Sequence, residues 1–161
     1  MTYPIIAFTG PKGCGKTTCA KLLTLYHGYD RLSFADPMKE MLAALGIDHG
    51  ALYGGEKEYP QPLLQGKTTR HAMQTLGTEW GRGQIGENFW ADIWGREVDA
   101  LDKPSYVVVD DARFQTEVDA IQSRGGIIVE VRRPGFEYSD AHLSEAGTGA
   151  PPYFTIRNDR G

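Results

Sequence analysis

The pattern of apolar residues at the start of the chain predicts a strand, a loop and a helix. Residues 3–8 form a short apolar run that closes before Gly10, and residues 16–27 carry apolar side chains at helical spacing. Gly28 then occupies the place just after a helix, where a left-handed backbone is common. The chain therefore begins as a β-loop-α unit.

The next segment repeats this alternation and then loses it. Residues 31–35 are typical of a second strand, and Asp36-Pro37 supplies an N-cap and a first-turn proline for a helix that runs to residue 45. From 46 to 66, glycine, proline and tyrosine recur without a period. We expect a surface excursion there and assign it no helix or strand.

The second half of the chain predicts more helices and strands in alternation. Residues 106–109 are an unbroken β-branched and aromatic run, as expected for a central parallel strand that is buried on both faces. Residues 132–152 are dominated by glycine, proline, serine and charge, which predicts a mobile loop. The remaining predicted elements are helices over 68–77, 87–101 and 115–124 and strands over 127–131 and 153–156.

These elements predict an α/β fold with a mostly parallel central sheet covered by helices. At 161 residues the chain fits a single domain over 1–161. The net charge of -4 and the pI of about 5.5 argue against a surface that as a whole attracts nucleic acid or an anionic membrane. Any anion that the protein binds must therefore be held locally.

The cysteines and the first residues bear on the compartment. Cys14 and Cys19 lie five residues apart across a predicted loop-to-helix junction, a spacing that offers no disulfide or metal pair. The first residues lack a basic region and a long apolar run, so they do not predict a signal peptide. No later stretch is apolar enough for a membrane span. We therefore expect a soluble protein of a reducing cytoplasm.

Residues 10–17 match the phosphate-loop pattern G-x-x-x-x-G-K-[ST], between the first predicted strand and helix. Lys16 is placed to reach the β- and γ-phosphates of a nucleoside triphosphate, and the Thr17 hydroxyl to ligate Mg²⁺. The expected ligands are ATP and Mg²⁺. The residues expected to contact the triphosphate are Gly10, Lys12, Gly13, Cys14, Gly15, Lys16, Thr17 and Thr18. The alternative is a glycine-rich turn with an incidental lysine.

A pair of carboxylates follows the strand over 106–109. Asp111 is the first choice for a carboxylate that orients Mg²⁺ at the sheet edge, and Asp110 is the alternative by position. Either residue is also consistent with a simple turn or cap. Arg113, two residues further on, is expected at the same edge, where a guanidinium binds phosphate with two parallel hydrogen bonds.

Other charged and aromatic residues remain open between function and surface or core. Phosphoryl transfer between two polyanions needs positive charge on both sides, which draws attention to four arginines: Arg70, Arg82, Arg132 and Arg133. His142 and Glu145 are expected to order the mobile loop rather than to act as acid and base. Trp90 is a candidate for stacking on a base, although aromatic residues at helical spacing more often belong to a core.

Five further segments, together with the phosphate loop, give the chain a resemblance that spans nearly its whole length. They read FADPMKEML from Phe34, RHAMQTLGTEWGR from Arg70, YVVVDDARFQTEVDAI from Tyr106, VRRPG from Val131 and HLSEAG from His142. In this order they resemble the deoxynucleoside monophosphate kinases of tailed bacteriophages, members of the P-loop nucleoside monophosphate kinase group. The chain differs from that pattern in a short stretch over 46–66 and in lacking a final helix after Asn158.

The resemblance implies a three-layer P-loop NTPase fold with a helical acceptor-binding region over about 36–100 and a lid over about 132–152. It implies that Lys12 bridges donor and acceptor phosphates, that Arg70 and Arg113 hold the acceptor phosphate, and that Arg133 is the lid arginine. Further residues implied on the substrate side are Asp36, Lys39, Gln74, Thr78, Glu79, Trp90, Asp111, His142 and Glu145.

The expected activity is Mg²⁺-dependent transfer of the γ-phosphoryl group of ATP to a deoxynucleoside monophosphate, without a covalent enzyme intermediate. Dephospho-coenzyme A kinase is the alternative enzyme, since it resembles this chain in the phosphate loop and in the FADP stretch. A non-catalytic P-loop switch is the alternative from another class. The expected partners are small nucleotides, with no nucleic acid and no membrane, in the cytoplasm of a host cell if the gene is a phage's. A homodimer is left open.

Overall fold

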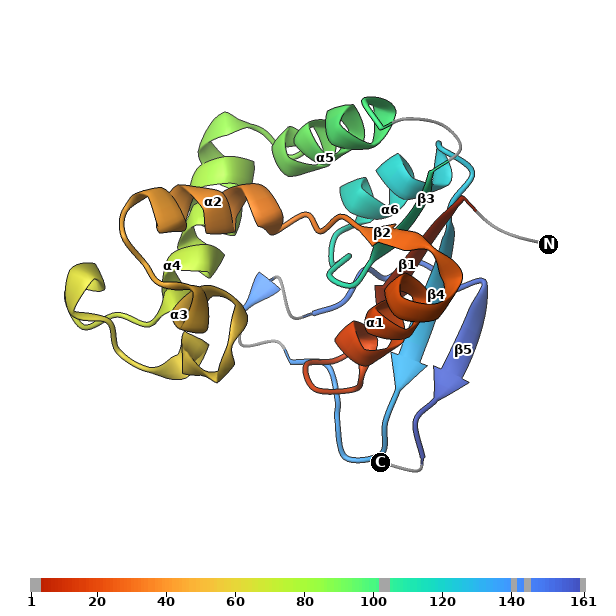
Figure 1. Cartoon of the computed structure of the whole chain (residues 1–161), viewed down its shortest axis with the longest axis horizontal. Coiled ribbons are helices and arrows are strands. Elements are labelled where there is room, and N and C mark those ends of the chain that lie inside the picture. The colour runs from red at the N-terminus through yellow and green to blue at the C-terminus, as the bar shows by residue number, and fades with distance from the viewer. Residues whose placement is uncertain (1–3, 102–104, 140–141, 144–145, 160–161) are drawn as a thin grey trace. The chain divides into compact units, whose positions relative to one another are not determined.

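The computed structural model describes residues 4–101, 105–139, 142–143 and 146–159 of the chain. Contacts divide the chain into two compact units (Figure 1). Unit 1 consists of Met1–Phe34 and Trp90–Gly161, and unit 2 consists of Ala35–Phe89. Unit 2 is therefore a continuous insertion in the sequence of unit 1.

Unit 1 is built on a five-stranded sheet in which every pair of neighbours is parallel. The strands are β1 (Ile5–Thr9), β2 (Tyr29–Arg31), β3 (Tyr106–Val109), β4 (Ile127–Arg132) and β5 (Phe154–Arg157), in the spatial order β2-β3-β1-β4-β5. The parallel sheet confirms the predicted α/β class. In the register of the two central strands Ala7 is paired with Val109, so Thr9 and Asp110 lie just beyond at the same carboxyl edge.

Helices cover both faces of this sheet. One face packs against α1 (Lys16–His27), whose Ala20 lies in a cluster with Phe8, Val108 and Val129. The other face packs against α5 (Phe89–Asp99) and α6 (Gln115–Gln122), with Trp94 and Ile121 fully buried. The apolar runs of β1, β3 and β4 thus serve two cores at once, as central parallel strands do.

Unit 2 is helical. Its elements are α2 (Asp36–Ala44), α3 (His49–Tyr53), 3₁₀ turns at Gly55–Glu58 and Pro62–Leu64, α4 (Thr69–Gln74) and a π-helix at Thr75–Ile85. Leu42, Ile47, Ala51 and Leu52 form its small buried core. None of the helices in the described parts of the two units combines the length and the apolar composition needed to cross a membrane.

Several predicted elements are confirmed with small shifts at their ends. The helix over 16–27 and the strand over 106–109 have the predicted bounds, and Gly28 closes α1 with a left-handed φ of 68°. The prediction of a strand over 31–35 was wrong, because β2 ends at Arg31. Leu32 still donates its N–H to Val108 of β3, but the Ser33 hydroxyl and the Phe34 N–H bond to the side chains of Asp110 and Asp111. Asp36 is the first residue of α2 rather than its cap.

The predicted helix over 68–77 is only half correct. It begins as α4, capped by the Thr68 hydroxyl, but from Thr75 onward the chain is wound as a π-helix. This winding is rare and occurs mostly as single turns near functional sites. The segment expected to be an excursion, 46–66, contains one short helix and two 3₁₀ turns.

Candidate active site

The phosphate loop connects β1 to α1 and is packed too closely for side chains at two of its glycines. Gly10 and Gly13 have positive φ values of 139° and 81°. A Cβ atom on Gly10 would lie 2.3 Å from the carbonyl oxygen of Val131, and one on Gly13 would lie 2.6 Å from the ring of Phe136. Only glycine combines this backbone with this proximity. The loop is therefore fixed against β4 and against the segment that follows it.

Lys16 lies under this loop. Its Nζ donates to the carbonyl oxygens of Gly10 and Pro11, both at 2.7 Å. Burial lowers the pKa of Lys16, and the nearby charge of Arg113 acts in the same direction, against the opposing effects of Cys14 and Asp110. The ammonium group is thus held in the curve of the loop by neutral acceptors, which bind a cation more weakly than phosphate oxygens do.

Thr17 and Asp110 form a hydrogen-bonded pair at the end of β3. The Thr17 hydroxyl donates to one carboxylate oxygen of Asp110 at 2.8 Å. The other oxygen accepts from Arg31 Nε at 3.0 Å and from the Ser33 hydroxyl at 2.9 Å. Burial would raise the pKa of Asp110, but the charge of Arg31 and these hydrogen bonds outweigh it and lower the pKa. Asp110 is therefore an ionised, fully oriented carboxylate.

Asp111, the first choice from the sequence, has different surroundings. Its carboxylate accepts a hydrogen bond from the backbone N–H of Phe34 at 3.1 Å. Consecutive side chains at a strand end point in different directions, and here Asp110 is the one whose carboxylate contacts Thr17. The geometry thus favours Asp110, the alternative, for a role beside the phosphate loop, and gives Asp111 a contact that holds the chain after β2.

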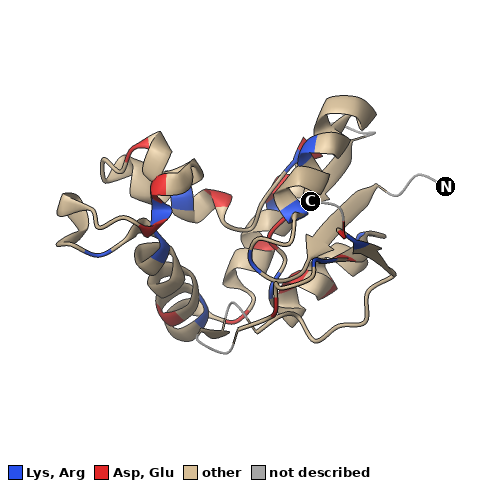
Figure 2. Ribbon diagram, turned by 90° about the horizontal axis from the view of Figure 1, so that it is seen from below, with Lys and Arg blue, Asp and Glu red and all other residues tan. Residues whose placement is uncertain are grey.

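Three cations lie along one small cleft of about 50 Å³ in unit 1. Lys12, Lys16 and Arg113 line it, together with Tyr138 and one acidic residue, Glu137. Elsewhere, basic and acidic positions are interspersed along both units (Figure 2). The cleft therefore concentrates positive charge locally in a chain whose net charge is -4.

The segment after β4 begins with two arginines in different environments. Arg132 points its Nε at the Glu130 carboxylate, 2.8 Å away, and its side chain is 68% exposed. The Arg133 guanidinium lies over the ring of Phe136, 4.9 Å from the centroid, and this ring is the one that lies against Gly13. Arg133 is thus linked to the phosphate loop through Phe136. His142 is half-buried, and Glu145 lies outside the described residues.

Six of the residues expected on the acceptor side lie in unit 2: Asp36, Lys39, Arg70, Gln74, Thr78 and Glu79. Trp90, Asp111, Arg113 and His142 belong to unit 1. Arg70 donates to the carboxylate of Glu58. Asp36 and Lys39 form an ion pair at 3.0 Å, and Lys39 Nζ also lies 4.5 Å from the centroid of the Tyr53 ring. Gln74 ends α4, and Thr78 and Glu79 belong to the π-helix. Trp90 is 4% exposed within α5.

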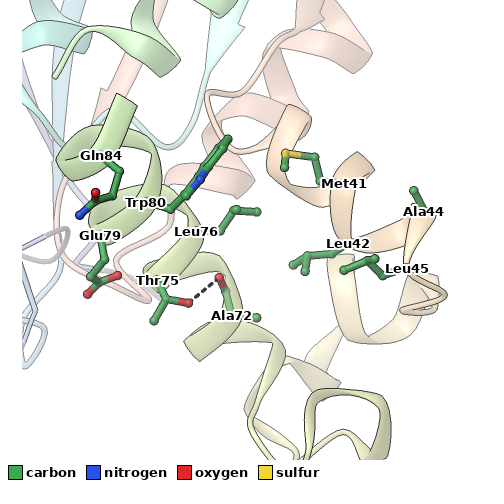
Figure 3. A pocket seen from close by; sticks show the side chains of 10 residues that line it. All are labelled: Met41, Leu42, Ala44, Leu45, Ala72, Thr75, Leu76, Glu79, Trp80 and Gln84. Atoms are coloured by element: carbon green, nitrogen blue, oxygen red, sulfur yellow. Dashed lines mark hydrogen bonds between the residues drawn. The ribbon is translucent and has the colours of Figure 1, made fainter. Parts of the chain in front are cut away.

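Unit 2 also contains an open groove of about 790 Å³ between α2 and the π-helix (Figure 3). Met41, Leu42, Leu45 and Leu76 give it an apolar lining, with Trp80 and Gln84 from the π-helix. The i→i+5 winding places residues four and five apart on the same side. Thr75, Glu79, Trp80 and Gln84 consequently face the same groove. Among the expected acceptor residues that the structure describes, Glu79 is the one that lines it.

Three polar residues of unit 1 with structural roles at this site were missed from the sequence. They are Arg31 and Ser33, which orient Asp110, and Glu117, which accepts hydrogen bonds in the turn that carries Arg113. A weak signal was present for Ser33, because it is the polar residue within the apolar run from Leu32 to Ala35, whereas Arg31 directly follows Asp30 and carries no such signal. Glu117 follows Arg113 by four residues, a spacing that is compatible with an ordinary helix cap. Thr18, predicted at the phosphate loop, is exposed on α1.

Comparison with known proteins places the chain in a family. The family model described as deoxynucleotide monophosphate kinase matches residues 63–159. A protein of Acanthamoeba polyphaga mimivirus that carries the same name is 33% identical over an alignment of 154 residues, and the alignment covers 88% of this chain and 80% of the relative. The deoxynucleotide monophosphate kinase of Enterobacteria phage T4 is 33% identical over 84 residues, 50% of this chain and 34% of the phage protein.

A solved structure of shikimate kinase from Acinetobacter baumannii, in complex with shikimate, covers 99% of this chain and 86% of its own, with 16% identity and a TM-score of 0.47. Similarity at that level carries no argument about activity. The family model and the mimivirus relative are sufficient, because the first matches more than half of the chain and the second aligns over most of both proteins. The chain therefore belongs to the deoxynucleotide monophosphate kinase family and is a nucleotide kinase.

Proposed function

We propose that the chain transfers the γ-phosphoryl group of ATP to the phosphate of a deoxynucleoside monophosphate, giving ADP and the deoxynucleoside diphosphate. The observation that carries this proposal is the convergence of Lys12, Lys16 and Arg113 on one cleft at the phosphate loop. The names of the viral relatives supply the acceptor class. Transfer through a loose transition state needs charge neutralisation and alignment rather than a covalent intermediate.

On the donor side, the backbone N–H groups of the phosphate loop and the start of α1 bind the triphosphate. Lys16 exchanges its carbonyl partners at Gly10 and Pro11 for β- and γ-phosphate oxygens, which are stronger acceptors. Burial lowers the pKa of Lys16 because an isolated ammonium group is costly away from water. A phosphate partner offsets that cost, so the buried ammonium favours binding of the triphosphate.

Thr17 and Asp110 are the residues that would hold Mg²⁺. A hydroxyl and an ionised carboxylate within hydrogen-bonding distance are the oxygen ligands that this ion prefers, either directly or through its waters. When bound, Mg²⁺ supplies charge neutralisation on the β- and γ-phosphate oxygens. We assign this role to Asp110 rather than Asp111 because Arg31 and Ser33 keep the Asp110 carboxylate ionised and oriented.

The remaining roles follow the chemistry of each side chain. Arg113 and Lys12 bind phosphate oxygens in the cleft, and Arg70 binds the acceptor phosphate by exchanging its Glu58 partner. Arg133 adds charge to the transition state from the segment after β4. Asp36, Lys39, Gln74, Thr78 and Glu79 contact the acceptor nucleoside, and His142 orders the segment before β5.

A coupled assay of ADP release tests the proposal. Purified protein is given ATP and Mg²⁺ with each deoxynucleoside monophosphate, each ribonucleoside monophosphate, or dephospho-coenzyme A, and each reaction is repeated with EDTA. We expect turnover with at least one deoxynucleoside monophosphate and none with EDTA. Turnover with dephospho-coenzyme A alone would replace the proposed acceptor, and ATP binding without turnover on any acceptor would support a nucleotide switch instead.

A further inference from the structure

Glu117 is a buried carboxylate in unit 1 to which the proposed mechanism gives no role. It is the third residue of α6 and is 5% exposed. One of its oxygens accepts two backbone hydrogen bonds, from the N–H of Arg113 at 2.6 Å and from the N–H of Phe114 at 3.0 Å. Burial raises the pKa of Glu117 to about 7, against the opposite effect of these two bonds. Burying a carboxyl group costs free energy, so we expect this one to contribute to the structure or the function of the protein.

A helix cap explains only part of this arrangement. Capping α6 requires an acceptor for the N–H of Phe114, the residue that precedes the first turn. The shorter of the two bonds goes one residue further back, to Arg113, which lies outside the helix. Glu117 therefore holds the backbone of the turn that connects β3 to α6, in addition to the helix itself.

The side chain on this turn needs to be held in place. Arg113 lines the cleft with Lys12 and Lys16, and its charge helps to lower the pKa of Lys16. Like charges at close range repel one another, and arginine has many rotamers through which its guanidinium can move away. On the other side of the turn, Asp111 is bonded to the N–H of Phe34 and Ala112 is buried. The backbone on both sides of Arg113 is thus restrained.

We propose that Glu117 is a positioning residue for phosphoryl transfer, whose buried carboxylate fixes the turn that directs Arg113 into the cleft beside Lys12 and Lys16. The inference rests on the proposed function only in taking Arg113 to bind a phosphate group. It predicts that the loss of Glu117 acts on catalysis through Arg113 and has no separate effect of its own on the reaction.

A double-mutant cycle tests this prediction. Glu117→Met removes the acceptor, keeps the volume and avoids leaving a charge unpaired, and it is combined with Arg113→Ala. kcat and KM for the deoxynucleoside monophosphate and for ATP are measured for both single variants and for the double variant, with thermal midpoints as the measure of folding. We expect Glu117→Met to lower kcat/KM for the monophosphate by roughly tenfold in the native background and by less than about twofold in the Arg113→Ala background.

Two further variants separate positioning from stability. Glu117→Gln retains an oxygen that can accept both N–H bonds, so we expect kcat/KM within about threefold of the native protein. Asp119→Ala is the matched control, because Asp119 lies on the same helix, is exposed, and its carboxylate accepts a hydrogen bond from the nearby Gln115 side chain at 2.7 Å. It should change neither kinetic constant.

Two outcomes would overturn the inference. One is a loss in Glu117→Met that is undiminished when Arg113 is already alanine, and the other is a loss in a folded Glu117→Gln as large as that of Arg113→Ala. The Gln variant keeps the test decisive if the Met variant does not fold. Failure of the proposed function would look different, because the unaltered protein would then show no turnover of any deoxynucleoside monophosphate.

Discussion

The two units of the molecule present their polar groups in different ways. In unit 1 the groups of the candidate site come from sequence positions as distant as Thr17 and Asp110, and they meet because the carboxyl ends of parallel strands share one edge. In unit 2 the expected acceptor residues lie on α2 and on the continuous run of α4 and the π-helix, and some have partners nearby in the sequence, such as Asp36 with Lys39. The topology of the sheet brings the first set together, whereas the second set is distributed over three helices of one continuous segment of the chain.

This contrast suggests that substitutions in unit 1 impair catalysis itself, whereas substitutions in unit 2 change which acceptor is bound and how tightly. The following experiments test that division, beginning with the largest expected effect.

Lys16→Ala is expected to reduce kcat/KM by about a thousandfold or more. The substitution removes the positive charge beside the β- and γ-phosphates, where negative charge develops in the transition state. Steady-state kinetics with a circular dichroism melt would measure the effect. Lys21→Ala is the matched control, since Lys21 is an exposed lysine of the same helix, α1. Near-native turnover in a folded Lys16→Ala protein would contradict the assignment of residues 10–17 as the phosphate loop.

Arg133→Ala is expected to lower kcat by roughly a hundredfold while the separate dissociation constants of ATP and monophosphate change little, because a group that acts mainly in the transition state contributes little to ground-state binding. Arg133→Lys should restore only part of kcat, since a point charge cannot reproduce a planar two-pronged contact. Calorimetric titration with each substrate alone would supply the constants.

Arg132→Ala provides the comparison for Arg133, because Arg132 is already paired with Glu130 within its own strand. We expect its kcat to stay within about threefold of the native value. If Arg133→Ala weakens both substrates and leaves kcat unchanged, Arg133 is a ground-state anchor instead.

Arg70→Ala is expected to raise KM for the monophosphate by roughly tenfold or more and KM for ATP by much less, because a charge-assisted contact to one substrate is removed. Initial-rate measurements that vary each substrate in turn distinguish the two effects. Arg82→Ala is the control from the same unit, where Arg82 bonds to the carbonyl oxygen of Glu87. A larger increase in KM for ATP than for the monophosphate would mean that Arg70 binds the donor nucleotide. It would contradict the proposed difference between the two units.

The last prediction concerns the stability of the fold rather than catalysis, and it depends on Glu117 and pH. Its pKa in the folded protein is raised from 4.5 to about 7, so between these values the unfolded chain has lost a proton that the folded chain keeps. The stability that this group contributes therefore falls as pH rises from about 4.5 to 7 and stays low above that range. Glu117→Gln does not titrate. The difference in unfolding free energy, Gln variant minus native protein, should rise by no more than roughly 3 kcal/mol over that window.

Denaturant melts of both proteins at several pH values would measure this difference, and the comparison cancels the other titrating groups. A difference that is flat with pH would mean that folding does not raise the pKa of Glu117.

The fold of unit 1 was largely predictable because its signals are local. The helix over 16–27 is bounded by a phosphate-loop pattern and by Gly28, and the strand over 106–109 is an uninterrupted β-branched run. The strand over 31–35 was misplaced because Leu32, Ser33 and Phe34 look like a continuing strand. Their hydrogen-bond partners are Val108, Asp110 and Asp111, which lie more than 70 positions further along the chain. A local pattern of residues does not reveal such partners.

The site in unit 1 was predicted in outline, and its details depended on distant contacts. Glycine spacing identifies the phosphate loop, but the choice between Asp110 and Asp111 depends on which carboxylate faces Thr17. In unit 2 the π-helix had no sequence signal, because i→i+5 winding is rare and the glycines of Thr75–Ile85 are compatible with several backbone paths. The groove that it helps to line was therefore not foreseen.

The way in which unit 2 is inserted has a consequence for evolution and engineering. The chain leaves unit 1 after Phe34 and returns at Trp90, and both connections adjoin the buried core where the rings of Phe34 and Trp94 stand 4.8 Å apart. Residues 35–89 are therefore a single inserted segment. Phe34 precedes it and α5 begins at its end, and both contribute to the core of unit 1. A substitution anywhere within residues 35–89 would therefore alter no residue of the five strands and none of the phosphate loop.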